Sequence, residues 1–362
     1  MLRLPTPIVA LALALGLALA APSAALASSA SFNEDGILKV DGVPGELNTI
    51  VARPGGSGVI VADSAGIQAP GPPFADLCSQ TSPTEITCVG ERLIVAAGDG
   101  DDSVTIAPGL SGARVEGGPG NDRLQSGTIA EIRGEDGNDT IVGSDVVLSG
   151  GLPQSLADVL VGGPGDDTLA GGAGDDDVTG SEGNDTVSGG AGDDNLDGFH
   201  LSQTREEGAD GNDVLRGGDG NDSISGDTGR DRSYGEAGSD FLVMRADFND
   251  KRKPQRGDCG PGKDRASPGS KDRIAGCEQI LLAGACDSPC KDRAIVERVS
   301  RRGKRRTLLK RTRKIRDGRL DLLTLPRRLL RKRKLTVLIH SESRSAFSGP
   351  DGYLEVTLAR RI

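Results

Sequence analysis

Single aliphatic residues recur every nine positions along the middle of the chain, and glycine and acidic residues fill the intervals between them. The three residues around each aliphatic position, such as Thr168-Leu169-Ala170, suit a short strand whose middle side chain points inward. A loop of six and a strand of three make half a coil, so two repeats predict one full coil, and parallel strands stack from coil to coil. The aliphatic positions are Leu169, Val178, Val187, Leu196, Leu215, Ile224 and Leu242.

Alternating apolar runs separated by turn residues precede and follow the repeats. Upstream, Ile37–Val40 and Val59–Val61 predict strands that lead into the repeat region as its N-terminal cap. Downstream, Arg319–Leu325, Leu335–His340 and Tyr353–Leu358 predict a small β domain with turns at Asp317-Gly318 and Asp351-Gly352.

Eleven nonapeptides carry glycine at the fourth place and aspartate at the sixth. Two blocks of four copies run without a gap from Gly162 to Asp197 and from Gly208 to Val243, and three looser copies begin at Ala97, Gly117 and Gly134. The repeats of the first block read GGPGDDTLA, GGAGDDDVT, GSEGNDTVS and GGAGDDNLD. The alternative, low-complexity disorder, does not account for an aliphatic residue kept in phase.

Glycines that permit positive φ expose backbone carbonyls, and the aspartate supplies an anionic oxygen beside them. Carbonyl and carboxylate oxygens are the ligands that Ca²⁺ prefers, six to eight at a time. The candidate calcium ligands are therefore the sixth-place aspartates: Asp102, Asp122, Asp139, Asp167, Asp176, Asp185, Asp194, Asp213, Asp222, Asp231 and Asp240.

A coil made of two repeats places each of these aspartates over the aspartate two repeats later. The expected stacked pairs are Asp167 with Asp185, Asp176 with Asp194, Asp213 with Asp231, and Asp222 with Asp240. Asp102, Asp122 and Asp139 are not separated by whole pairs of repeats, which leaves them out of register with this strict period. The repeat from Gly226 has Ser233 at the aliphatic place and Arg230 before its aspartate, so we expect it to pack and bind poorly.

The pattern GGxGxDxUx, with U a large aliphatic residue, resembles the RTX, or haemolysin-type, calcium-binding repeat over roughly Ala97 to Val243. The resemblance implies an all-β chain: a right-handed parallel β-roll or β-helix solenoid with several Ca²⁺ ions in its loops. A small β domain would follow it. Secreted actinobacterial calcium-binding proteins look similar in the flanks as well, with early strands, a cysteine pair and a Gly-Asp-Gly-Asp-Asp entry as at Gly98–Asp102.

Folding of such a region is expected to depend on calcium. Each repeat buries one aliphatic side chain, worth about 1.5–3 kcal/mol, while ordering nine residues costs about 1 kcal/mol or more for each. Ions that bind only the folded array supply the missing free energy. The array is therefore expected to be largely unfolded without Ca²⁺ and ordered at millimolar Ca²⁺.

Charge is distributed unevenly. The net charge is −10, yet residues 291–362 hold 23 Lys+Arg and 7 Asp+Glu, a balance of +16, which leaves −26 for the rest. An acidic body repels itself unless cations neutralise it. Aromatic residues make up only 2% of the chain, so a large aromatic core is not expected.

The N-terminus predicts export. Arg3 precedes an unbroken apolar run from Ile8 to Ala21, which is too short for an ordinary membrane span. Ala25-Leu26-Ala27 fits a cleavage site before Ser28; an uncleaved anchor is the alternative. No later segment is apolar enough to span a bilayer, and the protein is expected to be secreted.

Six cysteines agree with an oxidising compartment. They form three neighbouring pairs, which we expect to be local disulfides, although six cysteines allow 15 pairings and a zinc site is the rival interpretation. The expected pairs are Cys78–Cys88, Cys259–Cys277 and Cys286–Cys290.

Two further segments carry open interpretations. Residues 258–280 form a cysteine-bracketed stretch in which Asp264 and Asp272 each precede an arginine. We expect it to cap the solenoid, with a separate metal site as the alternative. Residues 198–207 interrupt the array and contain His200, which indicates a tolerated surface insertion or a binding loop.

The predicted organisation is a signal peptide (1–27), N-terminal strands (28–95), the repeat array (96–243), a capping segment (244–290) and a basic β domain (291–362). No HExxH or GxSxG motif is present, and the carboxylates are explained by calcium, so no enzymatic role is expected.

The leading function is a secreted calcium-binding protein with a structural or surface-interaction role. The second is a module that binds anionic cell-wall polymer or polysaccharide through the basic C-terminal domain. The alternative for this domain is a solvated basic surface that also attracts the acidic roll. The third is a pore-forming toxin, but the sequence shows no amphipathic or apolar segment that could insert into a membrane. Nucleic acid is not expected as a partner, because the basic region lacks interleaved aromatics.

Overall fold

The computed structural model describes residues 27–56, 58–145, 157–198, 211–227, 229–244, 255–268, 272–277, 279–282, 290–299, 305–315, 321–324, 334–341 and 353–359. In this part of the chain every regular element is a strand, apart from one 3₁₀ turn, η1 (Ala75–Leu77). The expected all-β class is confirmed.

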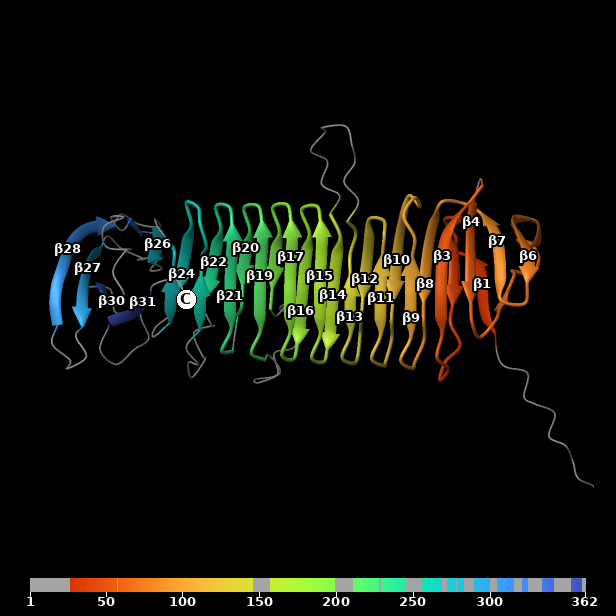
Figure 1. The fold of residues 1–362 in the computed structure, drawn as a ribbon, viewed down its shortest axis with the longest axis horizontal. Coiled ribbons are helices and arrows are strands. Elements are labelled where there is room, and N and C mark those ends of the chain that lie inside the picture. The colour runs from red at the N-terminus through yellow and green to blue at the C-terminus, as the bar shows by residue number, and fades with distance from the viewer. Residues whose placement is uncertain are drawn as a thin grey trace, which may run out of the picture.

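Two long sheets face each other along the molecule, and the chain passes from one to the other at each half coil (Figure 1). The first sheet follows the order β5 (Ile67–Gln68), β1 (Ser28–Phe32), β2 (Leu38–Asp41), β8 (Arg92–Ala96), β10 (Gly112–Glu116), β12 (Ala130–Arg133), β14 (Val159–Pro164), β16 (Asp177–Glu182), β18 (Asn195–Asp197), β20 (Ser223–Ser225), β22 (Phe241–Met244), β24 (Arg265–Pro268), β26 (Gln279–Leu282) and β29 (Asp321–Thr324).

The second sheet holds the strands between them. From β3 (Thr49–Gly55) it continues through β9 (Ser103–Ile106), β11 (Arg123–Ser126), β13 (Thr140–Val142), β15 (Thr168–Ala173), β17 (Thr186–Ala191), β19 (Val214–Asp219), β21 (Arg232–Ala237), β23 (Arg256–Asp258) and β25 (Arg273–Ala275).

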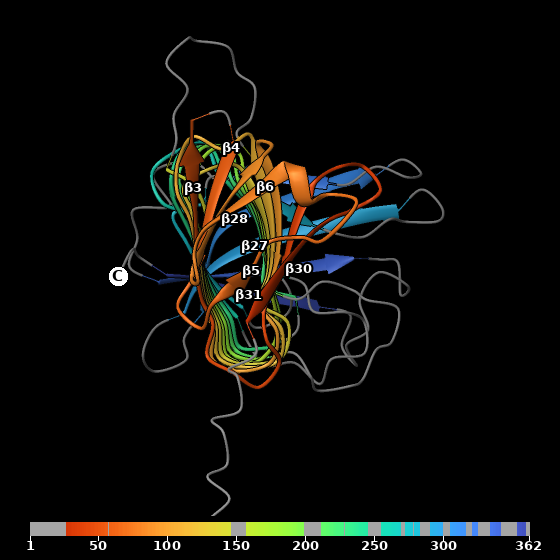
Figure 2. The same cartoon turned by 90° about the vertical axis from the view of Figure 1, so that its right-hand side faces the viewer.

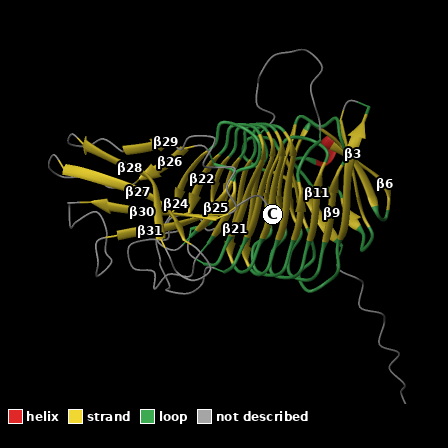
Figure 3. Ribbon diagram, turned by 60° about the vertical axis from the view of Figure 1, so that its left-hand side comes forward, coloured by secondary structure: helices red, strands yellow, loops and turns green. Residues whose placement is uncertain are grey.

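Parallel pairing in register joins each strand to the one a coil later. Leu169 lies beside Val187 in the second sheet, and Leu160 beside Val178 in the first. Seen end-on, successive coils superimpose, and their loops form two rows along opposite edges (Figures 2 and 3). The structure is therefore a parallel β-roll, as the nine-residue pattern predicts.

The aliphatic positions of the repeats fill the space between the sheets. All seven predicted side chains, from Leu169 to Leu242, are at most 1% exposed. Ser233 takes the aliphatic place in the second sheet, between Leu215 and Gly257, and it is also buried. The Met244 side chain reaches this gap, since a Cβ on Gly257 would lie 2.8 Å from its sulfur.

The strands are longer than the sequence pattern predicts. Strand β15 runs for six residues because its last residues pair with the next coil, Gly172 with Gly190 and Ala173 with Ala191. The expected loop of six therefore shortens to about three residues in such repeats. Glycine at the first two places has no side chain to oppose this continued pairing.

The N-terminal strands extend both sheets beyond the repeats. Strand β2 pairs with β8, and β3 with β9. Antiparallel strands β4 (Gly58–Asp63), β7 (Glu85–Val89) and β6 (Cys78–Ser82) then widen the second sheet. The predicted disulfide Cys78–Cys88 joins the last two strands and is confirmed.

At the other end, the roll continues through β23–β26. The predicted disulfide Cys259–Cys277 is confirmed and links consecutive coils there. Beyond it lie β27 (Cys290–Val299), β28 (Arg305–Ile315), β30 (Lys334–Ser341) and β31 (Tyr353–Ala359), the last of which pairs with β25.

The predicted strands near residues 319, 335 and 353 agree with β29, β30 and β31, whereas the sequence patterns did not indicate the long β27–β28 pair. Cys286, His200 and residues 1–26 lie outside the described residues, so the third cysteine pair, the insertion and the signal peptide stay predictions.

Candidate metal centre

Aspartates form a continuous column along the loops that lead into the second sheet. The backbone N–H of each aspartate donates to Oδ1 of the aspartate one coil later, at N···O distances of 2.7 to 3.0 Å. We name this set the first aspartate column, and its members are Asp102, Asp122, Asp139, Asp167, Asp185, Asp213 and Asp231.

The second aspartate column lies on the opposite edge, in the loops that lead into the first sheet. The same backbone N–H to Oδ1 bond repeats at 2.8 to 3.1 Å. Its members are Asp158, Asp176, Asp194, Asp222, Asp240 and Asp264. The four stacked pairs predicted from a coil of two repeats are thus confirmed as neighbours.

The aspartates upstream of the gapless blocks keep the same stacking despite their irregular spacing. Asp102, Asp122, Asp139 and Asp167 are consecutive in the first column, although 20, 17 and 28 residues separate them. The residues added to or missing from an 18-residue coil fall between strands, so the register of the coils is unchanged.

The second carboxylate oxygen of most column members has no partner. Asp167 is only 2% exposed, and its Oδ2 is buried without a hydrogen bond. The same holds for Asp102, Asp122, Asp139, Asp176, Asp194, Asp222 and Asp240. A buried carboxylate oxygen without a hydrogen-bond donor or a cation raises the free energy of the folded state. Binding of a proton or a cation at these Oδ2 atoms would remove that cost.

Burial also raises the pKa of these carboxyl groups. Desolvation raises the pKa of Asp122, Asp167 and Asp194 to about 7, against the lowering effect of the backbone N–H donor. The same cause raises the pKa of Asp139, Asp176 and Asp222 to about 6. At Asp167 the stacked carboxylates of Asp139 and Asp185 raise it further. Burial and the stacked carboxylates thus disfavour the ionised form of these aspartates when no cation neutralises them.

Backbone carbonyls border the same spaces as the free carboxylate oxygens. A Cβ built on Gly162, the first residue of its repeat, would lie 2.2 Å from Asp167 Oδ2 and 2.6 Å from the Gly180 carbonyl oxygen. On the other edge, a Cβ on Gly171 would lie 2.4 Å from Asp176 Oδ2 and 2.7 Å from the Gly189 carbonyl oxygen. Only glycine leaves this space open, and the oxygens around it are of the kind that Ca²⁺ binds.

Side chains alone do not assemble a metal site in the described ranges, where no group of three or more His, Cys, Asp and Glu converges on one point. A cation held between coils would instead combine one or two carboxylates with backbone carbonyls. Such a donor set is hard and oxygen-only, which fits Ca²⁺ and does not fit zinc.

A second, exposed ladder runs beside the first column with opposite polarity. Here the backbone N–H of the later residue donates to Oδ1 of the earlier residue, at 2.7 to 3.0 Å. We name it the outer ladder, formed by Asp101, Asn121, Asn138, Asp166, Asn184 and Asn212. It fixes the register of the loops, and its hydrogen bonds do not involve the buried Oδ2 atoms of the first column.

Two buried residues in these loops, Asp158 and Gln255, were missed by the sequence reasoning, which named Asp264 only within the capping segment. Asp158 heads the second column, and both its oxygens accept backbone N–H groups, from Ala130 and Ser144. It stands nine residues before Asp167 and two before Leu160, a phase that could have revealed it. Asp264 continues the second column, and Gln255 takes the corresponding place after Asp231 on the other edge.

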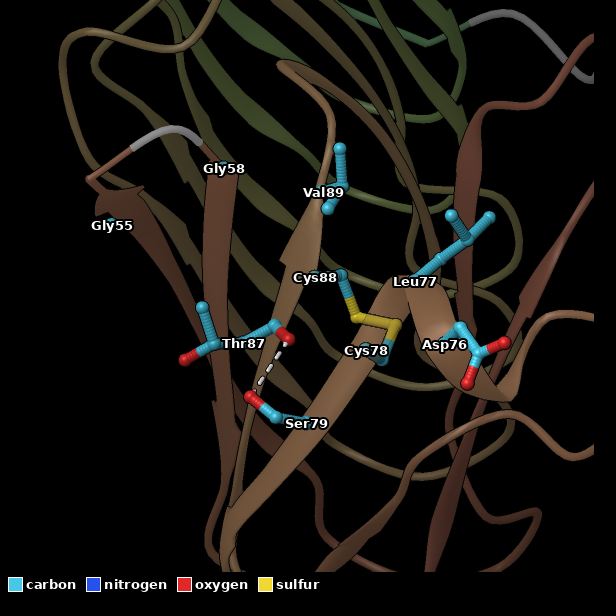
Figure 4. Close-up of a pocket in the computed structure, with 9 residues that line it drawn as sticks. All are labelled: Gly55, Gly58, Asp76, Leu77, Cys78, Ser79, Thr87, Cys88 and Val89. Carbon is cyan, nitrogen blue, oxygen red and sulfur yellow. Dashed lines mark hydrogen bonds between the residues drawn. A yellow bond between two sulfur atoms is a disulfide. The ribbon is translucent and has the colours of Figure 1, made fainter.

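A shallow hollow lies apart from the columns, at the N-terminal end (Figure 4). It measures about 210 Å³ and is lined by the Cys78–Cys88 disulfide, Leu77 and Val89. Asp76 is its one carboxylate, and no histidine borders it. Nothing in this lining indicates catalysis.

The fold and the loops together define a parallel β-roll solenoid whose coils meet through stacked aspartates. A model of the RTX calcium-binding nonapeptide repeat family matches the chain in four copies, at residues 131–145, 155–187, 171–198 and 207–242. These residues thus carry RTX calcium-binding repeats, which supports a calcium-binding repeat protein. No curated protein matches the chain.

Proposed function

We propose that this is a secreted protein whose repeat array folds on binding several Ca²⁺ ions and serves a structural or surface-interaction role, without enzymatic activity. The observation that carries the proposal is a set of buried Oδ2 atoms without hydrogen-bond partners that share a glycine-lined space with a carbonyl of the following coil, those of Asp122, Asp139, Asp167, Asp176, Asp222 and Asp240. The repeat family gives the identity of the cation.

The proposed ligands are the eleven sixth-place aspartates together with glycine carbonyls. Asp158 differs, because backbone N–H groups satisfy both of its oxygens. Asp158 is the first member of the second column and needs no cation to neutralise it. Bound Ca²⁺ would supply positive charge between coils, and the chain's own part is to hold the oxygens in stacked register through the Oδ1 bonds.

Export is supported by the N-terminal sequence, by two disulfides and by the position of the first strand. Strand β1 begins at Ser28, directly after the expected cleavage site. Ser28 is buried, and its hydroxyl donates to Asp63. Within the described residues, no helix is both long and apolar enough to cross a membrane.

Calcium titration of the full secreted chain tests the proposal. We expect isothermal titration calorimetry to show several Ca²⁺ ions bound, with dissociation constants on the order of 10⁻⁴ to 10⁻³ M. Far-ultraviolet circular dichroism should gain β signal over the same range of Ca²⁺ concentration. A chain that binds no Ca²⁺, or has the full β signal in chelator, contradicts the proposal.

The second candidate function, binding of anionic polymer by residues 291–362, is favoured by their balance of +16 charges. Strand β31 joins these residues to the roll through β25. Retention of the full chain on anionic wall polysaccharide, lost at high salt, would support it.

A further inference from the structure

Three arginines lie side by side on the outward face of the second sheet near its C-terminal end. Arg232 on β21 is the register partner of Arg256 on β23, and Arg256 is the partner of Arg273 on β25. All three side chains are exposed. We name this set the arginine column; neighbouring strands in a sheet are about 4.8 Å apart, so the column spans about 10 Å.

The register itself does not require arginine at these places. In earlier coils the same column position holds Thr140, Thr168 and Thr186, which are also register partners of one another. Like charges directly opposite on adjacent strands destabilise a sheet. Three consecutive arginines therefore oppose folding unless an anion lies across them.

Four exposed arginines in the described strands, Arg53, Arg114, Arg133 and Arg216, have carboxylate partners, whereas Arg92, Arg123 and Arg265 form no ion pair within the described residues. Arg133 binds Glu131 at 2.8 Å, and Arg114 binds Glu116 at 2.8 Å. Arg216, on the strand next to the column, binds Glu236 at 3.1 Å and lies 4.6 Å from the centre of the Tyr234 ring. Within the described ranges, no carboxylate forms an ion pair with any member of the arginine column.

The loops beside the column are less acidic than those of the earlier coils. Gln255, directly before Arg256, takes the place of a buried aspartate. Arg230 replaces the Asn or Asp of the outer ladder, where its N–H still donates to Asn212. Asp258, also on the outward side of β23, accepts the Gly260 N–H at 3.3 Å. The local surface is thus basic on an otherwise acidic roll.

We propose that the arginine column binds a linear anionic polysaccharide, with sugar carboxylates lying along the long axis of the roll. A guanidinium group forms paired hydrogen bonds to a carboxylate, and the strand spacing is close to the length of one sugar unit. The inference rests on the proposed surface-interaction role and gives it a ligand class. Because the column exists only when the coils stack, binding requires the Ca²⁺-loaded array.

Fluorescence anisotropy of labelled tetragalacturonate with the full chain at millimolar Ca²⁺ tests the proposal. The variant R232T/R256T/R273T carries the residue that this column position has in β13, β15 and β17. Each exposed pair contributes up to about fivefold in affinity, so we expect the triple variant to lose on the order of tenfold or more. Arg256→Thr should lose several-fold.

Arg123→Thr is the matched control, because it removes the same charge as Arg256→Thr. Arg123 occupies the same column position in β11, but neither of its register partners is an arginine. This variant should change the affinity less than twofold. Unlabelled tetragalacturonate should displace the probe, and neutral maltotetraose should not. Circular dichroism and Ca²⁺ titration of the same samples report whether the array folds.

Equal affinity of the wild type and a Ca²⁺-folded triple variant would overturn the inference and leave the proposed function standing. Equal losses for Arg123→Thr and Arg256→Thr would also overturn it, because they would show an effect of net charge alone. Binding of a single-stranded thymidine oligonucleotide in place of the sugar acid would exclude polysaccharide as the ligand class. An array that fails to fold with Ca²⁺ contradicts the proposed function itself.

Discussion

The N-terminal end of the molecule, residues 28–96, and the repeat array, residues 97–243, build the same two sheets around different interiors. In the N-terminal end, strands contribute two buried apolar side chains each, as Leu38 and Val40 do in β2 and Val59 and Val61 do in β4. In the first gapless block of the array, from Gly162 to Asp197, a repeat contributes one, and glycine occupies the next inward place. Side chains alone fill the first interior, whereas in the second the aliphatic side chains are accompanied by glycine places that carboxylate and carbonyl oxygens border.

Buried carboxylates differ in the same way. Asp63 accepts the Ser28 hydroxyl and the backbone N–H groups of Thr49 and Ala65, so its two oxygens are both satisfied. Asp167 accepts one backbone N–H on Oδ1 and has no partner on Oδ2. The N-terminal end therefore carries its own hydrogen-bond donors, and the array is built to receive a cation. The same architecture is thus expected to be stable without Ca²⁺ where hydrogen-bond donors bind both carboxylate oxygens, and to depend on Ca²⁺ where Oδ2 has no donor.

The largest expected effect comes from removing two stacked ligand charges, D176N/D194N. Asparagine keeps Oδ1 as the acceptor of the column bond but lacks the anionic Oδ2. With Ca²⁺ at about 100 times its dissociation constant, losing two sites should lower the free energy of unfolding by about 5 kcal/mol. In chelator the variant should be no less stable than the wild type. Urea denaturation measures the change with Ca²⁺, and the folded fraction by circular dichroism measures it in chelator.

The matched control for that variant is D175N/D193N. These neighbours are exposed, lie one coil apart and are joined by the bond from the Asp193 N–H to Asp175 Oδ1. The charge change is identical, yet Ca²⁺ affinity and stability should shift by no more than about 0.5 kcal/mol. If both double variants lose calcium equally, the buried oxygens are not the ligands.

Lower pH should stabilise the calcium-free array. Burial raises the pKa of Asp122, Asp167 and Asp194 to about 7, above the unfolded value of about 4, so the folded state holds more protons. This contribution is complete below about pH 4 and is lost as pH rises through 6 to 7. The free energy of unfolding in chelator should rise by about 1.4 kcal/mol per pH unit for each proton taken up.

The folded fraction in chelator at pH 8, 7, 6 and 5, followed by circular dichroism, measures that slope. Calorimetry should show weaker Ca²⁺ binding over the same range, because protons compete for the oxygens. A calcium-free array that becomes less stable between pH 8 and pH 6 would contradict the raised pKa values.

Removing the Cys259–Cys277 disulfide with C259A/C277A should lower stability by about 3 kcal/mol, because the bond closes a loop of 18 residues in the unfolded chain. The effect should be confined to the C-terminal coils. Thermal unfolding at saturating Ca²⁺ measures it, with C78A/C88A as the comparison at the opposite end, where the sequence separation is 10. Loss of the β signal throughout the roll would show that the two ends are not independent.

The smallest effect is expected for Ser233→Ala. The hydroxyl of Ser233 is buried among aliphatic side chains and has no hydrogen-bond partner. Removing it should stabilise the array by about 1 kcal/mol at saturating Ca²⁺. Chemical denaturation measures the change, and destabilisation instead would indicate that the hydroxyl is satisfied in solution.

Sequence alone predicted the period of the array because each repeat is a complete unit of glycine, aspartate and aliphatic residue. It therefore placed Asp176 over Asp194 and Leu169 beside Val187 correctly. It failed where insertions hide the period. Asp185 and Asp213 are 28 positions apart in the sequence yet are neighbours in the first column, and Asp158 lacks the preceding glycine of a full repeat.

Other features depend on packing that no local pattern contains. The lengthening of β15 into glycine places comes from pairing with the next coil, and Met244 fills the space left by Gly257 from a different sheet. The unpartnered Oδ2 atoms emerge only once the Oδ1 bonds and burial are known.

Hydrogen–deuterium exchange of the full chain, with millimolar Ca²⁺ and with chelator at pH 8, tests the central claim most directly. Peptides from residues 97–243 should be strongly protected with Ca²⁺ and lose that protection in chelator, while peptides from residues 28–96 should keep theirs. Equal protection of the array under both conditions would contradict the account.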